Sequence, residues 1–154
     1  MMTFLFAFLI GFFAGLRSLT APATTAWAAH LGWLKLARPL SFIGSIPSIV
    51  IFTVLAGVEL VVDKLPNTPN RTSPPALIAR ILTGGLTGAC ISMSGGQGVY
   101  LGAGLGAVGG IVGSFAGYRA RSGLVKTLGA PDIYIAIVED LVTVGGCLFI
   151  VSHV

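Results

Sequence analysis

The fold of this chain is decided by the stretch Gly98-Val-Tyr-Leu-Gly102-Ala-Gly-Leu-Gly106-Ala-Val-Gly-Gly110-Ile-Val-Gly113-Ser-Phe-Ala-Gly117-Tyr-Arg119-Ala-Arg121. Its glycines recur every fourth residue in two rows, namely Gly98, Gly102, Gly106 and Gly110, and then Gly109, Gly113 and Gly117. On a helix each row is a groove that another backbone can approach closely. Glycine costs a helix in water roughly 1 kcal/mol against alanine, but a backbone in lipid must satisfy its own hydrogen bonds. The stretch therefore predicts a tightly packed transmembrane helix.

The composition predicts one integral membrane domain, residues 1–154. Hydrophobic residues make up 55% of the chain and charged residues only 9%, against about 25% charged in a soluble domain. The formal net charge of +4 does not indicate nucleic-acid binding, because the basic residues stand singly at the ends of apolar segments. We expect membrane lipid as a partner and no nucleic acid.

The apolar segments predict an all-α, polytopic transmembrane bundle with about five to six membrane segments. Helices are expected at residues 1–16, 41–65, 76–93, 98–118 and 131–152. The first is expected to be a retained helix rather than a signal peptide, because no Lys or Arg precedes Arg17. Residues 18–31 are short for a span, which needs about 20 residues, and are expected as a re-entrant half-helix or a short tilted span. Residues 119–130 are expected to be amphipathic and basic.

Basic residues in two loops predict the orientation. The loop at 64–75 holds Lys64 and Arg71, the loop at 119–131 holds three basic residues, and the turn at 94–97 holds none. The positive-inside tendency therefore puts both loops in the cytoplasm and the C-terminus outside. Five segments place the N-terminus in the cytoplasm, and six place it outside.

A seven-residue pattern occurs twice, as Gly11-Phe-Phe-Ala-Gly15-Leu-Arg17 and as Gly113-Ser-Phe-Ala-Gly117-Tyr-Arg119. It suggests repeat halves at residues 1–65 and 98–154, joined by a helix at 75–93. With five segments the halves form an inverted repeat, a common plan of transport folds, and with six they run parallel. Chance similarity between two Gly/Ala-rich helices is the alternative.

Ionisable side chains at membrane depth form the candidate site. Each costs a few kcal/mol or more there, so such groups are paired, line water or carry a function. We expect buried pairs such as Arg17 with a carboxylate of the opposite half, and we expect Glu139 and Asp140 to point to different helix faces. The candidate substrate- or ion-binding residues are Arg17, Glu59, Asp63, Lys64, Arg80, Arg119, Glu139 and Asp140.

Several of these residues lie in phrases that resemble a known family. The phrases are Gly15-Leu-Arg17-Ser, Glu59-Leu-Val-Val-Asp63-Lys64-Leu-Pro66, the basic stretch around Arg119, and Glu139-Asp140. They resemble a family of small bacterial membrane proteins catalogued as domain of unknown function 4126. The resemblance implies a multi-pass protein of the bacterial inner membrane and brings no assigned activity.

The function that these features favour is a small transporter or channel-like protein, which moves a small polar or anionic solute or an ion through a polar cavity at the repeat interface. One alternative is a structural or assembly protein whose charge pairs only hold the fold, and a second is a translocase for lipid phosphates such as prenyl phosphates. Because so short a chain rarely encloses a pathway alone, we expect a homo-oligomer, most simply a dimer, packed through the glycine rows.

An enzyme is not expected. The sequence has no Ser–His–Asp set, His-rich metal set or phosphate-cradling loop. The two cysteines, Cys90 and Cys147, lie in apolar runs without the spacing of a metal site. We therefore expect no catalytic residue, no cofactor and no metal.

Overall fold

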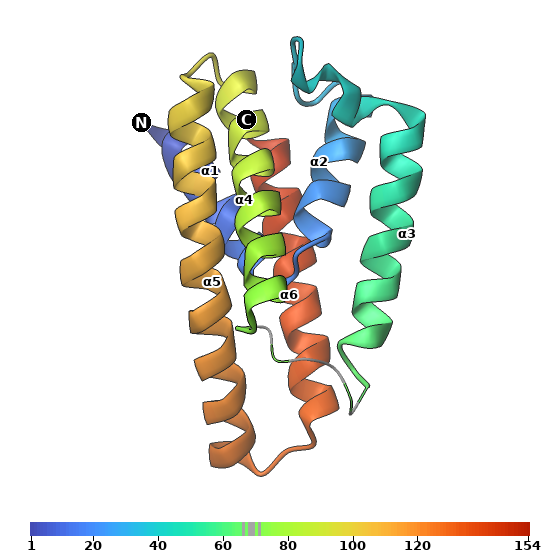
Figure 1. Ribbon diagram of the computed structural model, residues 1–154, viewed down its shortest axis with the longest axis vertical. Helices are drawn as coiled ribbons and strands as arrows, with labels where there is room; N and C mark the ends of the chain where they lie inside the picture. Colours follow the sequence, from blue (N-terminus) through green and yellow to red (C-terminus); the bar gives the residue numbers. More distant parts are fainter. Residues whose placement is uncertain (66, 68–69, 71) are drawn as a thin grey trace.

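The computed structural model is a bundle of helices (Figure 1). It describes residues 1–65, 67, 70 and 72–154. The elements in that part of the chain are α1 (Met2–Leu16), α2 (Thr20–His30), the 3-10 turn η1 (Leu40–Gly44), α3 (Ile46–Val62), α4 (Pro74–Ser94), α5 (Val99–Leu128) and α6 (Asp132–Ser152). Helices α4, α5 and α6 are long and apolar enough to cross a membrane, and α1 and α3 are shorter apolar helices. The chain is therefore an all-helical, membrane-embedded protein, as its composition predicts.

The two ends of the bundle serve as landmarks. The upper end, at the top of Figure 1, carries the turn at 94–97, both chain termini and the segment that joins α2 to η1. The lower end carries the turn at 129–131 between α5 and α6, the last turn of α3 and the first turn of α4. Of the expected loop at 64–75, positions 66, 68, 69 and 71 lie outside the described residues, so the structure does not place Arg71.

Helices α1 and α2 form a hairpin. Thr3, near the start of α1, contacts Gly95 in the upper turn. Beyond α2, the backbone N–H of Lys35 donates to Ser94 Oγ at 3.1 Å in the same turn. Because both ends of the unit lie at the upper end, α1 descends into the bundle and α2 returns. Residues 18–31 thus return to the end of the bundle at which α1 begins, with the hairpin tip at residues 17–19.

Glycine allows α5 to pack directly on the backbones of α1 and α4. A methyl group on Gly106 would overlap the carbonyl oxygen of Gly84 in α4, and one on Gly113 would overlap the carbonyl of Phe12 in α1. Gly102, Gly109 and Gly110 are similarly enclosed and Gly117 is buried, whereas Gly98 stands before α5 with open space around it. These rows are covered by helices of the same chain, so the expected oligomer would have to use another surface.

The two copies of the seven-residue pattern lie in parallel, neighbouring helices. Gly11 of α1 meets Gly106 of α5, and Gly15 meets Gly110 and Ser114, so residue numbers rise together along the two helices. An inverted repeat requires opposite directions, so that arrangement does not describe α1 and α5. Gly11 also lies beside Gly106 rather than beside its sequence counterpart Gly113, an offset of seven residues or about 10 Å along a helix.

Helix α3 is attached to the bundle mainly through its upper half. Ser45 caps its start by accepting from the Ser48 N–H at 3.5 Å. Ile49 and Phe52 join an apolar cluster with α2 and α4. From residue 53 to residue 65, Ala56 is the buried residue, and α3 packs on α2 and η1 but hardly on α4, α5 or α6. The lower half of α3 therefore depends on other contacts to stay in place.

Helix α5 continues through the stretch that was expected to be a separate basic segment. It remains helical to Leu128 and ends where Gly129 adopts a left-handed conformation, with φ of 59°. No proline interrupts residues 119–128, and the single glycine there, Gly123, is tolerated within a helix, so α5 continues past Tyr118. The arginines at 119 and 121 consequently sit on a rigid helix.

Candidate functional site

Arg17 lies at the hairpin tip, inside the bundle. The residue ends α1 with an extended backbone, φ −138° and ψ 110°, and its side chain is 0% exposed. The Ser114 hydroxyl donates to the carbonyl of Gly15 at 3.3 Å, which marks the level of the tip on α5. Helix α5 runs 14 residues further, to Leu128, which is about 21 Å along its axis. The tip is therefore deep in the molecule, where an unpaired guanidinium would be costly.

Two aspartates from different helices neutralise this guanidinium. Arg17 Nη1 donates to Asp63 Oδ2 at the end of α3. Arg17 Nη2 lies 2.5 Å from Asp140 Oδ1 of α6; neither of these two atoms makes an aligned hydrogen bond to a described residue, so this contact is an ion pair. Lys64 Nζ donates to Asp140 Oδ2 at 2.7 Å and to the Leu60 carbonyl at 2.8 Å. Two cations and two carboxylates thus form one chain across three elements.

Glu59 binds the start of α2 rather than a cation. Its Oε1 accepts from the Ser18 N–H at 2.8 Å and from the Ser18 hydroxyl at 2.6 Å, and its Oε2 accepts from the Leu19 N–H at 2.9 Å. These amides precede α2, and the first N–H groups of a helix have no partner within it. A carboxylate at this position also interacts favourably with the positive end of the helix dipole. Glu59 therefore ties the lower half of α3 to the hairpin tip.

A second ionic group joins the lower ends of α5 and α6. Arg121 donates from Nε to Asp132 Oδ1 at 2.8 Å and from Nη2 to Asp132 Oδ2 at 2.5 Å, a bidentate pair. Its Nη1 lies 3.8 Å from Glu139 Oε2. Glu139 thus faces Arg121 while Asp140 faces Arg17, so the expectation that these neighbours point to different faces is confirmed.

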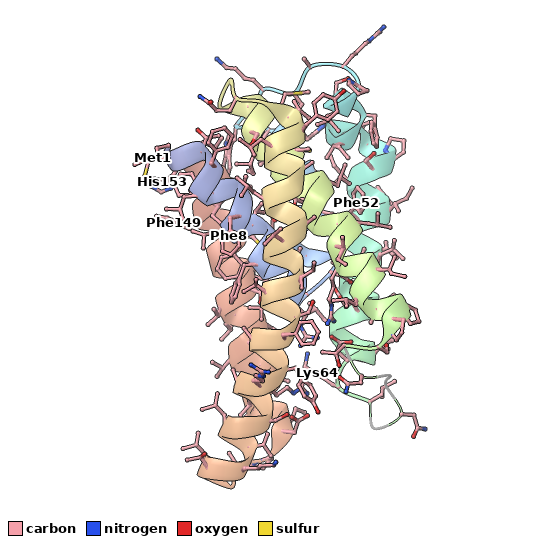
Figure 2. All side chains as sticks on the ribbon, turned by 60° about the vertical axis from the view of Figure 1, so that its left-hand side comes forward. Met1, Phe8, Phe52, Lys64, Phe149 and His153 are labelled. Atoms are coloured by element: carbon pink, nitrogen blue, oxygen red, sulfur yellow. The ribbon has the colours of Figure 1, made fainter. Side chains whose placement is uncertain are left out.

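A cavity of about 910 Å³ lies between α3 and the lower parts of α4, α5 and α6. It extends from Lys126, near the end of α5, to Ser18 at the hairpin tip. Figure 2 shows Lys64 in the lower half of the molecule, away from Met1 and His153 at the upper end. The charged lining of the cavity consists of the cations Lys64, Arg80, Arg121 and Lys126 and the carboxylates Glu59, Asp63 and Asp132.

All five acidic residues of the chain belong to this region. Glu59, Asp63 and Asp132 line the cavity, and Glu139 and Asp140 bind cations of its lining. Each lining carboxylate is bound by a donor of the protein: Glu59 by the hairpin tip, Asp63 by Arg17 and Asp132 by Arg121. The lining carries four cations and three carboxylates, a formal excess of one positive charge, although Lys64 is bound by Asp140 and Arg121 by Asp132 and Glu139.

The structure brings together most of the predicted site residues. Arg17, Asp63, Lys64 and Asp140 form one ionic chain, Glu59 joins it at the hairpin tip, and Arg80 lines the cavity from α4 with 4% of its surface exposed. The expected pairing of Arg17 with a carboxylate of the opposite half is confirmed by its contact with Asp140.

Arg119 is the exception among the predicted residues. It is exposed on α5 and is absent from the cavity lining, so it does not share the environment of Arg17, its counterpart in the repeated pattern. Successive helical residues differ in direction by about 100°, so residue 119 lies at the edge of the face that residues 118, 121, 122 and 125 present to the cavity, on nearly the same side as Lys126. The spacing in the sequence therefore did not distinguish Arg119 from Lys126, and only the position of the cavity does.

Arg121 and Lys126 line the cavity, although the sequence pattern used them only to predict the orientation in the membrane. Within the described residues, no group of three or more His, Cys, Asp and Glu side chains is arranged to hold a metal ion. The site is therefore built from guanidinium, ammonium, carboxylate and hydroxyl groups, which bind anions and hydrogen-bonding solutes through their charges and donors.

Comparison with known proteins places the chain in a family. Residues 4–153 match the model described as domain of unknown function (DUF4126). The chain is a member of the DUF4126 family. No curated protein and no solved structure matches it. The family description assigns no activity, so the function of this DUF4126 protein has to be argued from its cavity and ionic network.

Proposed function

We propose that this DUF4126 protein is a small membrane transporter or channel-like protein, and that its lower cavity binds a small polar or anionic solute or an ion. The observation that carries the proposal is the cavity itself, which has about 910 Å³ of space and a charged lining that reaches the tip of a broken helical segment. Charged groups are kept at membrane depth where they pair, line water or carry a function. Interrupted helices beside a polar site are typical of transporters.

The upper boundary of the cavity supports a transport cycle with a moving barrier. Above the hairpin tip, α1, α2 and α6 enclose an apolar cluster that includes Ile10, Ala14, Ala21 and Cys147. A solute at Ser18 passes this barrier only if the hairpin or α3 moves. Such a movement separates Arg17 from Asp63 and Glu59 from the start of α2, so these contacts are the proposed latch of the closed state.

The proposed orientation is that of a bacterial inner-membrane protein with the lower end in the cytoplasm. Lys64, Arg121 and Lys126 lie at the lower end, where Arg119 is also exposed. The upper end holds Lys35 and Arg38 in the segment after α2. The larger number of basic residues at the lower end favours its cytoplasmic placement, and the hairpin then puts the N-terminus outside.

The test is an electrical flux measurement on proteoliposomes with imposed gradients of chloride, phosphate and glutamate. We expect saturable charge movement with at least one of these anions. The signal should be lost in the double variant Arg80→Gln/Lys126→Gln and kept in Arg119→Gln, which removes an arginine outside the cavity. Folded wild-type protein that gives no saturable signal with any of them would overturn the proposal.

The ionic network itself favours a second candidate, a structural or assembly role without transport. Arg17, Asp63, Lys64 and Asp140 satisfy one another, as charges that only hold helices together would do. This candidate predicts that Arg17→Gln lowers stability while the proteoliposomes never carry a solute. A flux that depends on Arg80 and Lys126 would exclude it.

A further inference from the structure

The cavity has one weak wall, between α3 and α4. Helix α3 packs on α2 and η1 and hardly on α4, α5 or α6. Below residue 56, the side-chain contacts that tie α3 to the bundle include those of Glu59, Asp63 and Lys64 with the hairpin tip and α6. These contacts lie at the inner side of the cavity. On the outer side, the described residues of α3 and α4 face each other across the cavity with hardly any direct helix–helix contact.

The edges of this wall are apolar and face the surroundings. Val62 and Leu65 line the cavity from α3 and are 40% and 54% exposed. Ala76 and Ala79 line it from α4. In a membrane-embedded bundle, apolar exposed helix faces contact lipid, and Ile78, beside Ala79, is 56% exposed. The wall is thus a lateral portal, defined here by residues 62, 65, 76 and 79, between the cavity and the bilayer.

The interior beyond the portal carries cations from three helices. Lys64 follows α3, Arg80 belongs to α4, and Arg121 and Lys126 belong to α5. Phosphate oxygens accept several charge-assisted hydrogen bonds at once, which suits a site where guanidinium and ammonium groups arrive from different directions. Tyr118 and Ser122 add hydroxyl groups to the same lining.

We propose that the cavity binds the phosphate-type anionic headgroup of a membrane amphiphile, which enters sideways through the portal between α3 and α4. Its apolar chain lies across Val62, Leu65 and Ala79 and remains in the lower leaflet, while its headgroup meets Arg80 and Lys126. The volume of about 910 Å³ is at the upper end of the range for pockets that enclose drug-sized ligands, so it accommodates a headgroup and the start of a chain. This inference rests on the proposed function and specifies its substrate class.

The experiment uses phosphatidylcholine vesicles that contain the full-length protein and a small fraction of phosphatidic acid with a photoactivatable acyl chain. We expect crosslinks in the lower half of α3 and the first turns of α4. Unlabelled phosphatidic acid should compete, whereas added phosphatidylcholine should not. Arg80→Gln/Lys126→Gln should reduce labelling roughly tenfold or more, because hydrogen bonds to charged groups are the stronger class, and Arg119→Gln should leave it unchanged.

A matched pair of tryptophan variants tests the route of entry. Ala79→Trp fills the portal and should abolish labelling, whereas Ile78→Trp adds the same bulk to the exposed face of α4 and should preserve it. Labelling that is unaffected by Ala79→Trp, or that is spread over all exposed helices, would overturn the inference.

Inorganic phosphate tests whether the bound phosphate group belongs to a membrane lipid or comes from solution. If phosphate in solution displaces the lipid probe and binds equally well to Ala79→Trp, the ligand comes from water, the lateral inference is wrong and the proposed function stands. If neither phosphatidic acid nor inorganic phosphate binds while an anion gradient still drives flux, only the substrate class is wrong. A folded protein that binds neither and shows no flux contradicts both proposals.

Discussion

The two copies of the Gly–x–Phe–Ala–Gly–x–Arg pattern are alike in sequence and different in environment. Arg17 is fully buried between Asp63 and Asp140, whereas Arg119 is exposed on α5. The cause is the offset between two parallel helices, which places Gly11 beside Gly106 instead of beside Gly113. α1 ends at its arginine, deep in the bundle, while α5 carries its own copy further toward the lower end. The difference teaches that the pattern specifies close helix packing, and that the position of the helix end decides what its arginine does.

The strongest test of this contrast is Arg17→Gln. The substitution removes the cation that Asp63 binds and leaves Asp140 with Lys64 as its cation. Removing one partner of a buried ion pair costs about 3–5 kcal/mol, because the remaining charge is uncompensated. We expect a loss of this size in the free energy of unfolding, measured by SDS titration with tryptophan fluorescence. Adding Asp63→Asn should recover part of it, and a loss below about 1 kcal/mol would show that Arg17 is not effectively buried.

The glycines of the two copies should respond alike, unlike the arginines. A methyl group on Gly11 would overlap the Gly106 carbonyl, and one on Gly113 would overlap the Phe12 carbonyl. Because backbone cannot rotate aside, Gly11→Ala and Gly113→Ala should each cost about 1–3 kcal/mol in the same titration. Gly104→Ala is the control, since nothing lies within 4 Å of the added carbon, and it should stabilise α5 by up to about 1 kcal/mol. Equal effects at all three positions would contradict the close packing of α1 against α5.

Glu59→Gln tests the tie between α3 and the hairpin tip. The amide keeps the size of the carboxylate but loses the charge that faces the Ser18 and Leu19 N–H groups and the start of α2. We expect a smaller loss of about 1–2 kcal/mol and faster hydrogen exchange at the first turn of α2 and the last turn of α3. Exchange that rises equally in α4 and α5 would indicate global destabilisation instead of release of α3.

Arg119→Gln should have the smallest effect. An exposed side chain away from caps, cores and ion pairs contributes within about 0.5 kcal/mol, so its unfolding curve should overlay that of the wild type. A loss comparable to that of Arg17→Gln would mean that the two copies of the pattern are equivalent after all, and the contrast between them would be wrong.

Part of the candidate site was predictable because polar groups in an apolar environment must find partners. From Arg17 and the acidic pair in the last helix, an opposite-half contact follows, and Asp140 makes it. The spacing of one residue between Glu139 and Asp140 predicts different faces, and they bind Arg121 and Arg17 respectively. The binding of Glu59 to backbone amides was not predictable, because a helix start exposes the same donors in every sequence and gives no signal of its own.

The sequence by itself determined that this is a helical membrane protein, that its glycine rows pack closely and that its intramembrane charges need partners, because lipid satisfies neither backbone hydrogen bonds nor charges. Only the tertiary structure decided the direction of α2, the offset between α1 and α5, and hence which arginine is buried. Those features depend on contacts between segments far apart in the chain, such as Thr3 with Gly95 and Gly11 with Gly106. The cavity also depends on the tertiary structure, because it exists only where α3 stands apart from the helices it faces.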